Sequence, residues 1–202
     1  LMCWLYTGTF GSFIGYSAGF PLLARTQFPE VDALQLVFLG PLVGALSRSL
    51  TGWVSDRWGG GRVTLWVFAA MALGVYGVIH FIDAKNFAGF FASFLFLFFA
   101  SGVGNASTFQ MIPAIMGKDM ARLMPGATAE VRRVQAEKES AAIIGFTSAI
   151  AAYGAFFIPK SYGSAIALTG GPQAALWGFL IFYLTCIAIT WGFYTRRGGL
   201  DI

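Results

Sequence analysis

The chain alternates between long apolar stretches and shorter polar connections. Six apolar stretches cover residues 1–23, 33–54, 63–82, 87–116, 141–158 and 173–194. The connections between them are residues 24–32, 55–62, 83–86, 117–140 and 159–172. A helix needs about 20 residues to cross a bilayer, so each apolar stretch is long enough. The pattern therefore predicts an all-α membrane protein with six transmembrane helices.

The composition supports this prediction. Of 202 residues, 57% are hydrophobic and 11% are charged, and the mean hydropathy is +0.70. A soluble domain carries about 25% charged residues. The net charge of +4 comes from basic residues in the connections and indicates topology, not nucleic-acid binding. Cys3 and Cys186 both lie in apolar stretches, so we expect no disulfide, no metal site and no cofactor.

Basic residues are divided unequally between the two sides that six spans define. One side carries Arg57, Arg62, Lys118, Arg122, Arg132, Arg133, Lys138, Arg196 and Arg197. The other side carries Arg25, Lys85 and Lys160. Connections rich in lysine and arginine stay in the cytoplasm. We therefore predict that residues 117–140 form a cytoplasmic loop and that the C-terminus is cytoplasmic.

Arg48 is the charged residue that lies deep inside an apolar stretch. A charge at this depth costs about 2.5–3.5 kcal/mol on insertion scales, and such residues usually serve function. Gly40, Gly44, Arg48 and Gly52 recur every four positions and so share one helix face. A row of small residues lets another helix approach closely, so we predict that Arg48 faces the bundle interior. The alternative is an arginine that extends to the nearer membrane surface.

Acidic residues are absent from the middle of the apolar stretches, because all nine lie in connections, at span ends or in the tail. Arg48 therefore has no neighbouring carboxylate, and an anionic ligand is its natural counter-charge. The same absence leaves no evident proton relay in this chain. An intramembrane protease needs an aspartate pair, a Ser/His pair or metal ligands at membrane depth, and the chain has one histidine. We therefore do not expect an enzyme.

The second polar connection contains a motif. Gly52, Asp56, Arg57, Gly59 and Arg62 follow the pattern G-x-x-x-D-R/K-x-G-x-R/K, with one extra glycine before the last arginine. This pattern resembles a cytoplasmic loop of the major facilitator superfamily, in which the loop helps to hold the cytoplasmic side closed. The glycines permit a tight turn, and the charged pair is available for ion pairing. The alternative is an ordinary basic loop.

Four longer segments narrow the resemblance: residues 8–29, 40–60, 102–113 and 145–163. They resemble, in order, the C-terminal six of the twelve helices of the nitrate/nitrite porter family (NarK type) in that superfamily. The resemblance implies that residues 1–202 are the C-terminal half of a longer transporter, built as an inverted 3+3 repeat. It also implies a missing N-terminal half with a second arginine, and a location in the bacterial plasma (inner) membrane. A chain that begins inside an apolar run fits a fragment.

The resemblance also assigns roles to individual residues. Arg48 corresponds to the substrate-binding arginine of the family, and Tyr6 and Phe10 correspond to aromatic residues that line the site. Gly145 and Ser148, one turn apart, are the contributors expected from a glycine-rich signature. Without the resemblance, Tyr6 would be a membrane-interface aromatic, and Gly145 and Ser148 would serve helix packing.

Asn105 is a further candidate, chosen by its depth in the membrane and not by the resemblance. At a rise of 1.5 Å per residue, it lies about as deep in its span as Arg48 does. Its amide would either contact the substrate or hydrogen-bond to a neighbouring helix.

Together these features predict a carrier that exchanges nitrate for nitrite by alternating access. Nitrate is a planar monoanion, and a guanidinium offers a planar pair of donors that suits it. Proton-coupled nitrate symport, or a permease for another small anion, is the alternative within transport, and a six-helix scaffold is a remote one. The expected partners are nitrate, nitrite, the lipid bilayer and the missing N-terminal half.

Overall fold

The computed structural model describes residues 1–196, and every regular element in them is helical. Arg197, part of the predicted basic tail, lies outside the described residues. Five helical segments are long and apolar enough to cross a membrane: Ala33–Leu50, Gly60–Asp83, Phe87–Leu123, Ala129–Thr169 and Gln173–Thr195. The all-α prediction is confirmed, and five of the six expected spans have the length and composition of membrane spans.

The first expected span, residues 1–23, is helical but is not one of these five. It comprises α1 (Met2–Tyr6), a π turn (Thr7–Gly11) and α2 (Ser12–Gln27). Its many glycine, serine, threonine and tyrosine residues make it more polar than the other spans. A π turn interrupts the regular α-helix, and such turns are frequent at functional sites.

The second expected span is divided near its C-terminal end. After a 3-10 turn at Ala33–Leu36, α3 (Leu39–Leu50) is followed by the short α4 (Gly52–Trp58). Next, α5 (Gly60–Asp83) begins directly after Gly59, whose φ of 85° lies in the left-handed region. Glycine adopts this conformation without steric penalty, and the chain reverses its direction here.

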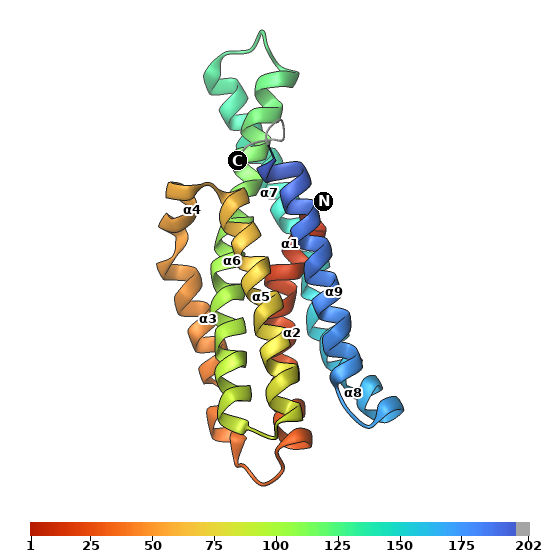
Figure 1. Ribbon diagram of the computed structural model, residues 1–202. Coiled ribbons are helices and arrows are strands. Elements are labelled where there is room, and N and C mark those ends of the chain that lie inside the picture. The colour runs from red at the N-terminus through yellow and green to blue at the C-terminus, as the bar shows by residue number, and fades with distance from the viewer. Residues whose placement is uncertain (197–202) are drawn as a thin grey trace.

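The next two helices, α6 (Phe87–Leu123) and α7 (Ala129–Ala152), correct the prediction that residues 117–140 form a loop. Between the two helices, residues 124–128 are non-helical. The 37 residues of α6 span about 55 Å at 1.5 Å per residue, more than the hydrocarbon thickness of ~30 Å. Figure 1 shows that α6 and α7 extend past the other helices as a hairpin.

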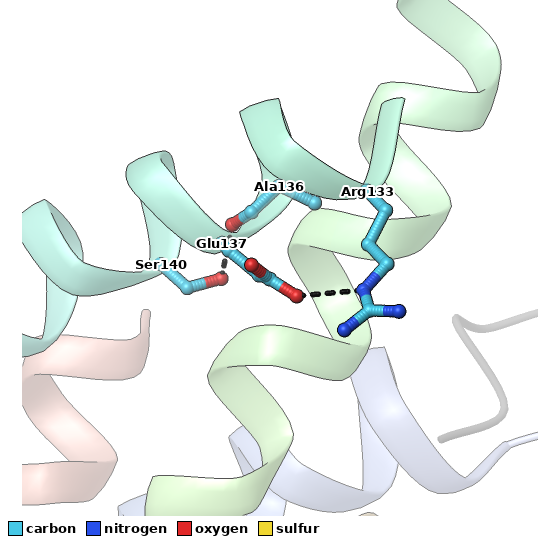
Figure 2. A network of polar contacts seen from close by, with 4 residues as sticks. All are labelled: Arg133, Ala136, Glu137 and Ser140. Carbon is cyan, nitrogen blue, oxygen red and sulfur yellow. Dashed lines mark hydrogen bonds and ion pairs between the residues drawn. The ribbon is translucent and has the colours of Figure 1, made fainter. Parts of the chain in front are cut away.

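Local interactions explain why this polar segment is helical. The Thr128 side chain accepts a hydrogen bond from the Val131 backbone N–H at 3.4 Å and so caps the start of α7. One turn later, Arg133 Nε lies 2.8 Å from Glu137 Oε1, and Figure 2 shows the two side chains facing each other. Such i,i+4 pairs support a solvent-exposed helix. The polar composition here therefore marks an exposed helix.

The helix α8 (Gly154–Thr169) corrects the prediction of a loop at 159–172, since most of that segment is helical. Three buried residues recur at helical spacing along it: Ile158, Tyr162 and Ala165. This spacing places them on one face of the helix, and α8 packs against α2. Burial of that face explains why the helix continues past the predicted end of the fifth span.

The helix α6 occupies the centre of the bundle and packs most extensively against α5 and α3. On the far side of α5 lies α9 (Gln173–Ile189), which is continued by a π turn at Thr190–Thr195. Aromatic rings fill much of the core. Phe94 is the centre of one cluster, with ring centroids 5.1 Å from Phe20 and 5.0 Å from Phe90. The edge-on contact of Phe20 with Phe94 joins α2 to α6.

Figure 1 shows the connections divided between the two ends of the bundle. The α4–α5 turn and the α6–α7 hairpin lie at one end, and the α5–α6 and α8–α9 connections lie at the other. Arg57, Arg62 and Arg133 therefore lie toward one physical end of the molecule, and Lys85 lies at the opposite end. This arrangement agrees with the predicted topology, while the cytoplasmic location of the basic end stays a prediction.

Candidate functional site

An open cavity of about 270 Å³ lies beside Arg48, where α2, α3 and α6 meet. Its lining consists of Phe13, Gly44, Ala45, Arg48, Ser49, Gly102 and Asn105. No carboxylate is among these lining residues. The cavity therefore carries one positive charge without a counter-charge of its own.

Glycines bring the three helices close together around this cavity. A methyl group on Gly102 would overlap Ser47 Oγ and the carbonyl oxygen of Gly44. A methyl group on Gly44 would overlap the ring of Phe13. Ser47 Oγ also crosses from α3 to α6, donating a hydrogen bond to the Phe99 carbonyl oxygen at 3.2 Å. The small-residue face predicted on the second span thus forms the contact between α3 and α6.

Arg48 lies outside the packed core that the described helices form among themselves. The residue is exposed and borders the open cavity. Its guanidinium carbon lies 5.9 Å from the centre of the Phe109 ring on α6, a cation–π contact. Because Gly44 and Gly102 approach so closely, the space between the helices is filled and the side chain extends over α6. Within residues 1–196, no ion pair to Arg48 occurs.

Asn105 lies beside Arg48 in the same cavity, as its predicted depth suggested. The residue is 1% exposed, and its Oδ1 has no hydrogen-bond partner among the described residues. Its neighbours on α6 do pair between helices. Ser107 Oγ lies 2.8 Å from Thr64 Oγ1, and Thr108 Oγ1 lies 3.0 Å from Thr9 Oγ1. The side-chain oxygen of Asn105 therefore does not serve the helix-to-helix hydrogen bond that was the alternative.

Tyr6 and Phe10 form a stacked pair at the π turn of the first span. Their ring centroids are 5.3 Å apart, with an angle of 25° between the rings. Tyr6 is only 2% exposed, so it is a core residue and not a membrane-interface aromatic. Neither ring lines the Arg48 cavity, but Phe13, one turn after Phe10, does.

Gly145 and Ser148 lie on α7, and neither of them lines the Arg48 cavity. Gly145 is exposed, and a methyl group placed on it would have no atom within 4 Å, so it makes no packing contact within the described chain. Ser148 is half-buried. Gly154 behaves differently, because a methyl group there would lie 2.7 Å from Gly11 Cα. Close helix packing thus explains why residue 154 is a glycine, but it does not explain the glycine at residue 145.

The predicted gating loop forms α4, the turn that follows it and the first residues of α5. Asp56, Arg57 and Arg62 are exposed, and in the described part of the chain none of them forms an ion pair. Gly59 makes the left-handed turn noted above. The extra glycine of the motif is also structural, because a methyl group on Gly60 would lie 2.7 Å from Met111 Cγ. The loop therefore exposes charged side chains without ion-pair partners in the described part of the chain, on a turn whose shape depends on its glycines.

The sequence-based prediction missed four residues around Arg48. They are Phe13, Ala45, Ser49 and Phe109. Helical spacing offered a weak signal for two of them, since Phe13 follows Phe10 and Phe109 follows Asn105 by one turn. No three side chains of metal-ligand type come together within residues 1–196.

Comparison with known proteins identifies relatives over almost the whole chain. It is 47% identical over 205 residues to the nitrate/nitrite transporter NarU of Salmonella typhimurium, covering 98% of this chain and 44% of that protein. It is 46% identical to NarU of Escherichia coli, with the same shares covered. It is 36% identical to the probable nitrate/nitrite antiporter NarK2 of Thermus thermophilus, covering 98% of this chain and 42% of that protein. No protein-family model matches the chain.

Proposed function

Since this chain is homologous to the nitrate/nitrite transporters over about one half of their length, we propose that it is half of a nitrate/nitrite carrier. The homology confirms the family resemblance, and the relatives are transporters, not enzymes. In the proposed carrier this chain is the C-terminal six-helix half of a twelve-helix major-facilitator fold. The carrier lies in a bacterial inner membrane with the basic end of the bundle in the cytoplasm.

The observation that carries this proposal is the cavity shared by Arg48 and Asn105. Its lining contains a guanidinium, an amide and no carboxylate. A guanidinium presents paired donors in a plane, which matches the edge of a planar oxyanion. The Asn105 amide adds a further donor at the same place. A small anion supplies the counter-charge that the helices themselves do not.

The remaining site residues fit a substrate held between two halves. Carriers of this architecture bind substrate near the membrane midplane, where the halves meet. Arg48 and Gly145 are both exposed in this half, as residues on such a surface would be. In the proposal, Phe10 forms an aromatic wall with the buried Tyr6 stacked behind it, and Gly145 and Ser148 face the anion from α7. The other half contributes a second arginine.

We propose that transport is an exchange of nitrate for nitrite. In the empty carrier, closure would bring two unpaired arginines together, and their repulsion would hinder reorientation without an anion. Proteoliposomes of the full-length carrier test this. External nitrate should enter only vesicles loaded with nitrite or nitrate, and an imposed pH gradient should have no effect. Uptake driven by the pH gradient into empty vesicles would show proton symport instead.

A single substitution in the full-length carrier tests the binding role of Arg48. Arg48→Lys keeps the charge but removes the paired donors. Losing one charge-assisted hydrogen bond should raise the nitrate Kd roughly 10- to 100-fold. Arg133→Lys makes the same chemical change on an exposed helix of the hairpin, and it should leave the Kd unchanged. Isothermal titration on both variants measures the difference, and wild-type affinity in Arg48→Lys would contradict the proposed site.

A further inference from the structure

A second and larger cavity lies on the other side of the first span. It is an apolar crevice of about 620 Å³ between α8 and α9, with α1, the π turn and α2 as its floor. Its volume falls within the range of about 300–1,000 Å³ typical of small-molecule sites. None of its lining residues belongs to the Arg48 cavity.

The crevice exists because α8 and α9 pack on different helices. The main packing partner of α8 is α2, and that of α9 is α5. Small residues widen the gap between them, including Gly154, Ala175 and Gly178. Gly178 is exposed, and a methyl group placed on it would have no atom within 4 Å. The crevice therefore results from the way in which α8 and α9 are placed.

Four polar side chains of the lining are already hydrogen-bonded within the protein. Thr7 Oγ1 donates to the Cys3 carbonyl oxygen at 2.7 Å, and Ser161 Oγ donates to the Phe157 carbonyl oxygen at 2.6 Å. At the floor, Tyr183 Oη donates to Ser12 Oγ at 2.7 Å, and at one end Trp4 Nε1 donates to Thr185 Oγ1 at 3.0 Å. The crevice therefore offers few free partners to water or a polar ligand. Apolar cavities of this kind stay dry and take up apolar molecules.

The mouth of the crevice faces outward between two segments long and apolar enough to span the membrane, Ala129–Thr169 and Gln173–Thr195. Its rim is aromatic. Tyr153 is 65% exposed, Phe157 58% and Trp4 47%. In the membrane setting of the proposed carrier, on which this inference rests, both segments cross the bilayer and lipid meets the opening. We propose that the crevice binds an acyl chain of a phospholipid, which enters between α8 and α9 and covers the floor of the first span.

Photolabelling of the full-length protein tests this proposal, and its readout does not depend on transport. The protein is reconstituted in phosphatidylethanolamine and phosphatidylglycerol vesicles, in which some phosphatidylglycerol carries a diazirine on one acyl chain. Mass spectrometry then maps the labelled residues. We expect label on Cys3, Ala175 and Phe179 inside the crevice, as well as on outward-facing Ile181. Label on Ile181 without label in the crevice would overturn the proposal and indicate that another protein segment covers it.

A matched pair of glycine substitutions sharpens the test. Gly178→Leu fills the crevice, and Gly192→Leu places the same side chain on an equally open glycine that does not line it. Gly178→Leu should lower crevice labelling about fivefold, because a leucine occupies the space of the acyl chain. Labelling of Ile181 should not change in either variant. Equal crevice labelling in both variants would contradict the proposal, and the wild-type labelling pattern tests it even if a variant fails to fold.

Discussion

The glycines in the membrane parts of α3 and α6 differ from three glycines of α7, α8 and α9 in what surrounds them. A methyl group on Gly40 would overlap the Phe98 ring, and one on Gly102 would overlap the backbone of α3. On Gly145, Gly163 or Gly178, a methyl group would have no atom within 4 Å. Burial separates α6 from the other segments in this comparison: 44% of its most apolar stretch is buried, against 22% for the segment with α3 and 22% for that of α7 and α8.

The difference shows that glycine spacing alone does not reveal what a glycine does. In α3 and α6, the missing side chain lets two backbones of the same chain meet. At Gly145, Gly163 and Gly178, the missing side chain leaves an open surface, which only lipid, substrate or another protein segment can cover. Gly145 and Gly154 both lie in the segment 145–163, yet a methyl group on Gly154 would meet the Gly11 backbone and one on Gly145 would meet no atom within 4 Å.

The largest expected effect on stability concerns the tightly packed glycines of α3 and α6. Gly102→Ala in the full-length carrier places a methyl group against Ser47 Oγ and the Gly44 carbonyl oxygen, and backbone has little room to move. We expect a loss of about 3 kcal/mol in the free energy of unfolding. Titration with denaturing detergent measures the loss. Gly117→Ala, also in α6 but with no atom within 4 Å, should be neutral or stabilising. Similar stability of both variants would show that close packing around a glycine does not determine the cost of adding a methyl group.

Gly154→Ala should have a somewhat smaller effect. Its methyl group would press on the Gly11 backbone, with Gly11 Cα at 2.7 Å, and separate the start of α8 from the π turn. We expect about 2 kcal/mol of destabilisation, measured by the same detergent titration. The control is Gly163→Ala in the same helix, where the methyl group meets nothing. A Gly154→Ala variant as stable as this control would show that the two helices separate without cost.

Gly145→Ala should have the smallest effect on stability, below about 0.5 kcal/mol, because the position is open. If Gly145 faces the anion as proposed, the added methyl group should nevertheless lower nitrate exchange about tenfold, equal to about 1.4 kcal/mol. Counterflow in proteoliposomes measures this, with Gly163→Ala as the control. Unchanged exchange would place Gly145 outside the site and leave it as part of an open surface.

Apolar patterning predicted the helices well where the residues are apolar, and less well where a helix leaves the membrane. The segment 117–140 is polar, and its helicity depends on the Thr128 cap and on pairs such as Arg133 with Glu137. These signals are local and short, so composition concealed them. The π turn at Thr7–Gly11 has no comparable signature in the sequence.

The candidate site was predictable in part. Depth along the helices brought Arg48 and Asn105 together correctly. The contact of Arg48 with Phe109 depends on how α3 and α6 are rotated relative to each other, which depth does not specify. Tyr6, Phe10, Gly145 and Ser148 lie outside the Arg48 cavity, and the roles proposed for them require the half of the relatives that this chain does not cover.

The helix α7 is continuous from the hairpin to Gly145, so this part of it can tilt as one rigid rod. Between Thr128 and Gly145 no residue interrupts the helix, and at 1.5 Å per residue this rod is about 25 Å long. A tilt of about 10° around Gly145 would therefore carry the hairpin tip through about 4 Å, following from the same rise per residue. A small adjustment of α7 around an anion would thus become a displacement in the aqueous phase that spin labels on the hairpin can measure.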